Sequence, residues 1–359
     1  MNNIAGIRRE LIARGLDAVL VTDEKNQRYA TGFPFTDGYV LVAREKAWLI
    51  TDSRYIEAAE KIAGGCCTVQ MFDREHSAVS LLKAALAEAG VEKLAAEEEK
   101  LSYASFASLS KNLEKQFYAS RGLLMGLRAS KNQEEIDSMI QAQRISEKAL
   151  EKTLTLIKPG MTEREVMAEL SYYMLKFGSE GNSFDPIVVT GKNTSMPHGV
   201  PGDTVIQAGD FITMDFGSLK NGYCSDMTRT VAVGHATEEM ENVYYTVLKA
   251  QLAGIAAARS GIPGKLIDKA ARDVIEAAGS GAYFGHGFGH SLGLDIHEPP
   301  LTGPRGEALM AENDLCSAEP GIYIPGKFGV RIEDVMIIRK DGAEVITKAP
   351  KMELIVLNN

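Results

Sequence analysis

Residues 211–233 have the sequence FITMDFGSLKNGYCSDMTRTVAV, which predicts a β-hairpin with a carboxylate on each strand. Asn221-Gly222 is a strong signal for a two-residue turn, because both central positions of such a turn need positive φ angles. With this turn, Thr228 lies opposite Asp215. Side chains alternate between the faces of a strand, so Asp215 and Asp226 are expected on one face as diagonal neighbours.

Two carboxylates this close need a positive partner. Without one they repel each other, and one of them takes up a proton, whereas a divalent cation removes the conflict. The alternative is a surface hairpin in which both acids are solvated. The apolar residues around Asp215 favour a buried strand and therefore a metal site; they are Phe211, Ile212, Met214 and Phe216.

The second part of the chain contains a similar arrangement twice, in which two helices separated by Pro-Gly precede strands. The Pro-Gly pairs begin at Pro159 and Pro263, 104 residues apart. Two pairs of acids have nearly the same spacing, 104 and 107 residues, and they are Asp215 with Glu319 and Asp226 with Glu333. This repetition predicts two similar αα-β halves that each contribute two carboxylates to a shared site.

Residues 286–298, HGFGHSLGLDIHE, contain three of the six histidines in the chain. His286 and His290 have the H-x-x-x-H spacing of a zinc-binding helix, but Gly287 and Gly289 argue against a helix, since glycine costs about 1 kcal/mol in a helix interior. Glycines at this density let the backbone approach a ligand closely. A lone histidine is more often structural, but this trio, completed by His297, predicts a functional site.

The remaining acids also have apolar neighbours. Glu319 is part of SAEPGIY, residues 317–323, and Glu333 is part of GVRIEDVMII, residues 329–338. The second run alternates, which places Arg331 and Glu333 on one face of a predicted strand. An exposed ladder of ion pairs is the alternative, but residues 335–338 favour a buried strand, where an unpaired Glu would be costly.

Composition and charge exclude several classes of protein. The 359-residue chain is 45% hydrophobic and 24% charged, as is usual for folded domains. Its formal net charge of −9 argues against nucleic acid or an anionic membrane as a partner, since both require a cationic surface. No segment resembles a signal peptide or a membrane span, and the four cysteines form no C-x-x-C pair. We therefore expect a cytoplasmic protein with reduced thiols.

The pattern of the chain changes near residue 126, so we predict a mixed α/β domain at 1–126 and a second domain at 127–359. Ser130 and Gln133 fit a capping box that begins a helix running to about residue 158, and Thr162 and Glu165 fit another. In the first domain we predict strands at 17–22, 38–42, 47–51 and 93–96. Residues 8–14 are predicted to be the end of an amphipathic helix, and the other helices predicted there are 53–63, 77–90 and 102–113.

Four carboxylates and one imidazole form a ligand set made mostly of oxygen. Such a set suits Mn²⁺, Co²⁺ or Fe²⁺ better than a thiolate-rich zinc site would, with Zn²⁺ as a further candidate. Bridging carboxylates hold two ions roughly 3.5–4 Å apart, which generate hydroxide near neutral pH and polarise a carbonyl. Four negative ligands balance two dications. The sequence therefore predicts two divalent metal ions, and the choice of Mn²⁺ as the first candidate comes from the family resemblance described next.

These motifs resemble the Xaa-Pro peptidase family with the pita-bread fold, which includes prolidase and aminopeptidase P. The resemblance extends over nearly the whole chain, and it is most specific in the second domain. It implies an α/β creatinase-type N-terminal domain followed by an α+β pita-bread catalytic domain with pseudo-two-fold αα-β halves. The metal ligands that it implies are Asp215, Asp226, His290, Glu319 and Glu333.

The resemblance also implies roles for other residues. His198 and His297 would stabilise the tetrahedral intermediate and the substrate carbonyl, and Glu319 would pass a proton from the attacking hydroxide towards the leaving proline nitrogen. A proline-containing peptide substrate and a homodimer are likewise implied. The remaining matches, which would surround the substrate, are His286, Arg331 and Phe184.

Several alternatives share parts of this pattern. Methionine aminopeptidase has the same ligands but usually lacks the N-terminal domain, and creatinase has the architecture but works without metals. Inactive binding modules with this fold have generally lost ligands, whereas all five are present here. Within the family, prolidase cleaves Xaa-Pro dipeptides and aminopeptidase P shortens longer peptides. The sequence does not separate these two activities, and aminopeptidase P is our first choice.

Overall fold

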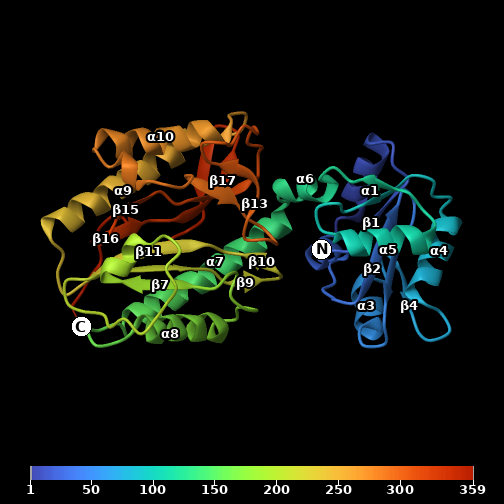
Figure 1. Cartoon of the computed structure of the whole chain (residues 1–359), viewed down its shortest axis with the longest axis horizontal. Coiled ribbons are helices and arrows are strands. Elements are labelled where there is room, and N and C mark those ends of the chain that lie inside the picture. The colour runs from blue at the N-terminus through green and yellow to red at the C-terminus, as the bar shows by residue number, and fades with distance from the viewer. Residues whose placement is uncertain (1, 359) are drawn as a thin grey trace. The chain divides into compact units, whose positions relative to one another are not determined.

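The chain divides into two compact units, residues 1–128 and 129–359, and the computed structural model describes residues 2–358 (Figure 1). We call them the first and the second unit. Within the described residues, no helix is both long enough and apolar enough to cross a membrane.

The first unit is built on a six-stranded sheet with the order β4-β3-β2-β1-β5-β6. β2 pairs antiparallel with β1 and β3, and the other neighbours are parallel. The apolar runs expected to form buried strands lie at its centre. The strands are β1 (Ala18–Val21), β2 (Gly38–Ala43), β3 (Ala47–Thr51), β4 (Thr68–Met71), β5 (Leu94–Ala96) and β6 (Phe117–Ala119).

Four helices of this unit match predicted ranges, with ends that differ by a few residues, and two were not predicted. α2 escaped prediction because most of its buried residues are polar: Asn26, Gln27 and Thr31 are buried beside Tyr29 and Ala30, so the segment lacks apolar periodicity. β4 and β6 were missed as well. The helices are α1 (Ile4–Ala13), α2 (Glu24–Thr31), α3 (Ile56–Ala63), α4 (Ala78–Glu88), α5 (Tyr103–Leu113) and α6 (Leu123–Ala129), whose last residue belongs to the second unit.

The second unit repeats one arrangement, as the spacing of its motifs predicted. In its first half, two helices precede a four-stranded sheet with the order β19-β11-β8-β7. The helices pack on this sheet through an apolar core that includes Leu150, Leu170 and Met214. The elements are α7 (Gln133–Leu154), α8 (Glu163–Lys176), β7 (Ile187–Thr190), the 3₁₀ turn η1 (Gly191–Ser195), β8 (Phe211–Phe216), β11 (Met227–Val233) and β19 (Val356–Leu357).

In the second half, two further helices pack against a five-stranded sheet with the order β13-β12-β14-β17-β18. Tyr244, Ile267 and Met336 belong to the core between them. Figure 1 shows α9 and α10 on one side of the second unit and α8 on the opposite side. The elements are α9 (Glu238–Ala257), α10 (Gly264–Ala277), η2 (Gly281–Tyr283), β12 (Gly289–Ser291), β13 (Glu298–Thr302), β14 (Leu315–Ala318), β17 (Asp334–Arg339) and β18 (Gly342–Val345).

One of the two predicted capping boxes is confirmed and the other is wrong. Thr162 and Glu165 form the reciprocal pair at the start of α8, as expected. At the start of α7 the pair is Asn132 with Glu135. The Ser130 hydroxyl instead donates a hydrogen bond of 2.8 Å to Asp314, a partner that is remote in sequence. The helix also ends at Leu154, four residues before the predicted end.

The strand predicted over residues 329–338 is interrupted, which corrects the prediction of one continuous alternating strand. β16 (Phe328–Arg331) pairs with β15 (Gly321–Ile324) in a separate ribbon, whereas β17 pairs with β14 in the larger sheet. The segment that pairs with β16 and β17 is interrupted at the same level, between β14 and β15. Glu319 and Glu333 each lie in one of these two interruptions.

Candidate metal centre and active site

All ten residues singled out in the sequence line one cavity of about 400 Å³ in the second unit. The cavity therefore brings together residues that are separated by up to 149 positions in the chain, from Phe184 to Glu333. Other lining residues include Asp185, Ile187, Pro197 and Ile296.

The hairpin that supplies two of the acids has the predicted register. Asn221 and Gly222 have positive φ angles of 51° and 77° and form the turn between β9 (Leu219–Lys220) and β10 (Tyr223–Cys224). Thr228 lies opposite Asp215 in the ladder. A Cβ atom on Gly217 would be only 1.9 Å from the carbonyl oxygen of Ser225, so glycine is required for this close approach.

His290 is oriented towards the acids by the backbone of the next residue. Its Nδ1 lies 3.1 Å from the carbonyl oxygen of Ser291, which accepts the Nδ1 proton. Nε2 lies 3.3 Å from Glu319 Oε1 and 3.6 Å from Asp226 Oδ2, and in the neutral ring it would carry the lone pair for a metal ion. A hydrogen bond of this kind fixes the tautomer of a metal-binding histidine.

The two glutamates are held at the interruptions of their strands. The backbone N–H of Glu319 donates to the carbonyl of Phe288 at 2.7 Å, and the N–H of Glu333 donates to the carbonyl of Thr228 at 3.1 Å. Ser317 donates its hydroxyl proton to Glu319 Oε1, and Thr228 donates to Glu333 Oε2. Each carboxylate therefore points into the cavity with one hydroxyl donor beside it.

These groups fit a cation. Ligand atoms of Asp226, His290 and Glu333 all lie within 4.8 Å of one another. Asp215 Oδ1 and Asp226 Oδ1 are buried and lack a hydrogen-bond partner among residues 2–358. A buried carboxylate oxygen without a donor is expensive, and a metal ion supplies the missing positive partner.

The pKa values describe an excess of negative charge in the cavity. Burial and the neighbouring carboxylates raise the pKa values of Asp226 and Glu333 well above their usual range. Burial opposes the charged forms of His290 and Glu319 as well, but their mutual contact raises the pKa of His290 to about 9 and lowers that of Glu319 to about 2. Such perturbed groups are frequent at functional sites.

Arg331 is held by the cavity wall. Its guanidinium donates to Asp215 Oδ2 at 2.6 Å and to the Tyr323 hydroxyl at 2.8 Å. The Tyr323 hydroxyl lies 2.9 Å from His286 Nε2. The sequence analysis did not select Tyr323, although it follows Glu319 by only four residues; an aromatic residue in an apolar strand gives no signal of a polar role.

The other two histidines face the cavity from different segments. His198 follows η1, and both it and His297 are exposed; the ring centroid of His297 lies 4.3 Å from that of His290. Burial and the neighbouring His290 lower the pKa of His297, which keeps it neutral and able to donate one hydrogen bond. Phe184, Ile187 and Ile296 supply apolar surface to the same cavity.

The histidine segment has no helix, which confirms the prediction. Its glycines lie against other parts of the chain. A Cβ atom on Gly289 would be 2.2 Å from the carbonyl oxygen of Ser317, and one on Gly293 would be 2.7 Å from the Glu298 carboxylate. These glycines therefore let the histidine segment pack closely against the backbone and side chains of other residues.

Two similar halves that surround a cavity of carboxylates and histidines define a metal-dependent hydrolase. Residues 137–340 match the metallopeptidase family M24, and residues 4–130 match the creatinase/prolidase N-terminal domain. The chain belongs to metallopeptidase family M24, with the pita-bread fold in its catalytic part.

Relatives of this chain cover almost its full length. An uncharacterized peptidase of Bacillus subtilis is 39% identical over 96% of each chain. The solved structure of an Xaa-Pro dipeptidase from Bacillus anthracis is 40% identical, covers 99% of both chains and has a TM-score of 0.94. That of an X-Pro aminopeptidase from Thermotoga maritima is 35% identical, covers 97% of this chain and 99% of the other, and has a TM-score of 0.92.

Proposed function

We propose that this chain is an Xaa-Pro aminopeptidase, which hydrolyses the bond between an N-terminal residue and proline with two divalent metal ions. The observation that carries the proposal is the convergence of Asp215, Asp226, His290, Glu319 and Glu333 on one cavity. Relatives named for Xaa-Pro cleavage support the substrate class.

The five ligands of the proposal favour Mn²⁺, with Co²⁺, Fe²⁺ and Zn²⁺ as alternatives, because four of them are carboxylates. Bound divalent ions would polarise the scissile carbonyl and lower the pKa of a water molecule. Of the five, Asp226, His290 and Glu333 have ligand atoms that all lie within 4.8 Å of one another. Asp215 is restrained by the hydrogen bond that its Oδ2 accepts from Arg331.

The remaining residues handle protons and the developing negative charge. We assign the transfer of the proton to Glu319. This residue lines the cavity, and its Oε1 contacts Ser317 and His290. His198 and His297 are the proposed hydrogen-bond donors to the oxyanion, a contribution that is commonly large in acyl transfer. His286 and Phe184 would contact the substrate.

The second candidate is an Xaa-Pro dipeptidase, which is favoured by the name of the relative from Bacillus anthracis. The test compares an Xaa-Pro dipeptide with an Xaa-Pro-Yaa tripeptide, with Mn²⁺ or Co²⁺ added and a chelator as control. Cleavage of the tripeptide supports the aminopeptidase, and cleavage of the dipeptide alone makes the protein a dipeptidase. If neither is cleaved in a metal-dependent way, the proposal is wrong and a binding role is favoured.

We propose three further properties with this function. The N-terminal domain ends near residue 126, where the sequence pattern changes. The protein acts in the cytoplasm. It also forms a homodimer, and light scattering of the purified protein would test the dimer by giving its molecular mass.

A further inference from the structure

The two interruptions that hold Glu319 and Glu333 face a single side chain on α9. Gln251 is fully buried, and its Nε2 donates to the carbonyl of Ala318 at 2.9 Å and to that of Ile332 at 3.2 Å. Each carbonyl belongs to the residue directly before a proposed metal ligand. The amide group of Gln251 therefore links the two backbone segments that carry Glu319 and Glu333.

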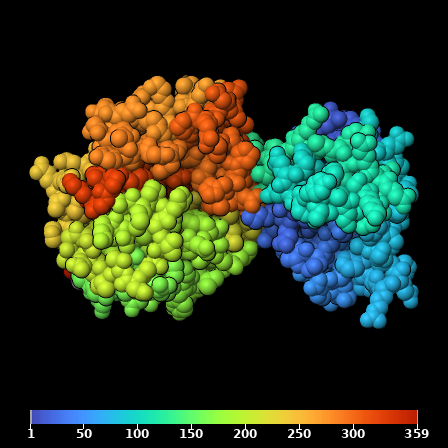
Figure 2. All heavy atoms as spheres, in the orientation of Figure 1, coloured from blue at the N-terminus to red at the C-terminus, as the bar shows by residue number. Residues whose placement is uncertain are grey.

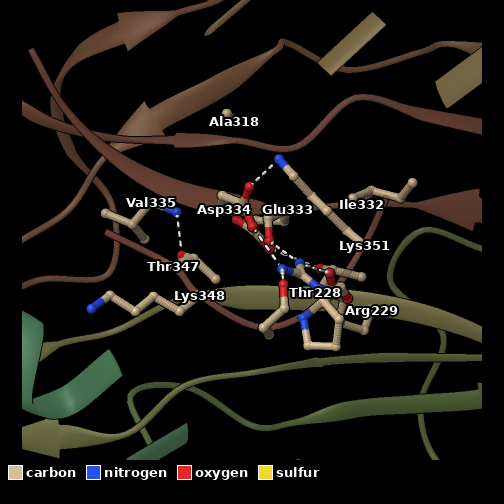
Figure 3. Close-up of polar contacts among 12 residues, drawn as sticks. Thr228, Arg229, Ala318, Ile332, Glu333, Asp334, Val335, Thr347, Lys348 and Lys351 are labelled. Carbon is tan, nitrogen blue, oxygen red and sulfur yellow. Dashed lines mark hydrogen bonds and ion pairs between the residues drawn. The ribbon is translucent and has the colours of Figure 1, made fainter. Parts of the chain in front are cut away.

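Gln251 is itself held by a buried polar network. Its Oε1 accepts a hydrogen bond from Lys351 Nζ, and the same ammonium group contacts Asp334 Oδ2. Asp334 Oδ1 in turn accepts a hydrogen bond of 2.8 Å from Arg229. Figure 3 shows Lys351 and Arg229 approaching Asp334 from different sides.

Arg229 extends this network to the backbone of Glu333 and to a distant segment. Its Nη1 donates to the carbonyls of Glu333 and Thr228, and its other nitrogens donate to the carbonyls of Ala349 and Pro350. Residues 349–351 therefore contribute two carbonyl groups and one ammonium group. In Figure 2 the red C-terminal residues lie between the yellow-green first half and the orange second half of the second unit.

We infer that Gln251 and Lys351 are positioning residues of the metal centre, which they tune from outside by fixing the backbone of Glu319 and Glu333. No side-chain atom of either residue lines the cavity. The strand pairing is interrupted at both glutamates, so the hydrogen bonds of the sheet alone do not set the distance between them. The inference rests on the proposed metal ligands. It makes the affinity for metal depend on residues 349–351, which contribute no ligand.

The test is the dissociation constant for Co²⁺ and for Mn²⁺, measured by titration calorimetry on the full chain with Gln251→Met. Loss of a group that supports metal ligands commonly weakens metal binding by about 10- to 100-fold, so we expect the dissociation constant to increase by that factor. The visible spectrum of bound Co²⁺ should also change, because the two glutamates change position. A purely structural role would leave both quantities unchanged at temperatures where the variant is folded.

Gln143→Met is the matched control. Gln143 is also fully buried in the second unit, on α7, and its amide atoms have no hydrogen-bond partner among residues 2–358. We expect wild-type metal affinity and an unchanged Co²⁺ spectrum for this variant. Lys351→Met tests the same network at its less buried end and decides the question if Gln251→Met does not fold; Lys351→Arg should restore part of the affinity.

The outcomes separate the inference from the proposed function. Dissociation constants within twofold of wild type for Gln251→Met, or for Lys351→Met if that variant is the one tested, overturn the inference alone. If the wild-type chain binds neither ion, the proposed metal centre is wrong and the inference fails with it. An equal loss of affinity in Gln143→Met would show a general effect of core substitutions and would also overturn the inference.

Discussion

Asp226 and His290 contribute to the proposed metal centre in different ways, and both should be indispensable. Asp226 is a buried carboxylate with a raised pKa, whereas His290 presents a fixed nitrogen to the same space. We expect Asp226→Ala and His290→Ala to lose metal and at least about 100-fold in kcat/KM, because the ions supply several kcal/mol of charge stabilisation. Metal content and peptide hydrolysis are measured on the same samples. Full turnover in either variant would contradict the ligand assignment.

His198 allows binding and catalysis to be separated. It lines the cavity but makes none of the contacts that hold the proposed ligands, so His198→Gln should retain metal. Loss of one donor to an oxyanion typically costs about 10²- to 10³-fold in kcat. We expect a decrease of this size with a nearly unchanged dissociation constant for metal. A variant with wild-type kcat would remove His198 from the proposed mechanism.

At the scale of elements, a buried ion pair lies beside the histidine segment, residues 286–298. Lys131, just before α7, has its Nζ 3.2 Å from Glu298 Oε2, and both side chains are 1% exposed. Glu298 directly follows His297 and begins β13. Breaking a buried pair from one side commonly costs about 3–5 kcal/mol, because the remaining charge loses its compensation. We expect Lys131→Met to lower the free energy of unfolding of the second unit by this amount, measured with denaturant.

Lys265→Met is the control for that experiment. Lys265 pairs with Glu307 at 2.6 Å, but both side chains are largely exposed, so solvent screens the interaction and its loss should have little effect. Equal destabilisation by both substitutions would show that burial of the Lys131 pair has no special weight.

Local signals in the sequence predicted elements well where one segment contained all the information. Asn221-Gly222 set a turn and with it the register of Asp215, and Thr162 with Glu165 began α8. Prediction failed where a distant partner decided the outcome. Ser130 and Asn132 are both able to cap a helix, and the contact of Ser130 with Asp314 leaves the role to Asn132.

The candidate site was easier to predict than its support. Carboxylates and histidines in apolar runs are conspicuous, whereas Gln251 and Tyr323 have ordinary surroundings in the sequence. The interruption at residues 332–333 was missed for a related reason: apolar and polar residues alternate up to Glu333, and an apolar run follows Asp334, so both sides are typical of a strand. Its position depends on β14 and β15, which lie earlier in the chain.

At the scale of the whole molecule, metal should stabilise one unit and leave the other unchanged. All five proposed ligands belong to the second unit, between residues 215 and 333. A ligand at 100 times its dissociation constant stabilises the folded state by about 2.7 kcal/mol. We expect calorimetry with Mn²⁺ and with a chelator to show a shift in the transition of the second unit. Equal shifts in both transitions would contradict a site confined to that unit.

The pairing of β19 with β11 sets an order of events during synthesis. Ala232 pairs in parallel with Val356, and Arg229 needs the carbonyls of Ala349 and Pro350. A ribosome adds roughly 5–20 residues per second, so Arg229 and β11 wait several seconds for these partners. During this interval the guanidinium lacks its two carbonyl partners at residues 349 and 350, and one edge of the sheet is unpaired. We therefore expect the nascent first half of the second unit to bind chaperones, and the support of the proposed metal centre is completed only after residues 349–357 have left the exit tunnel.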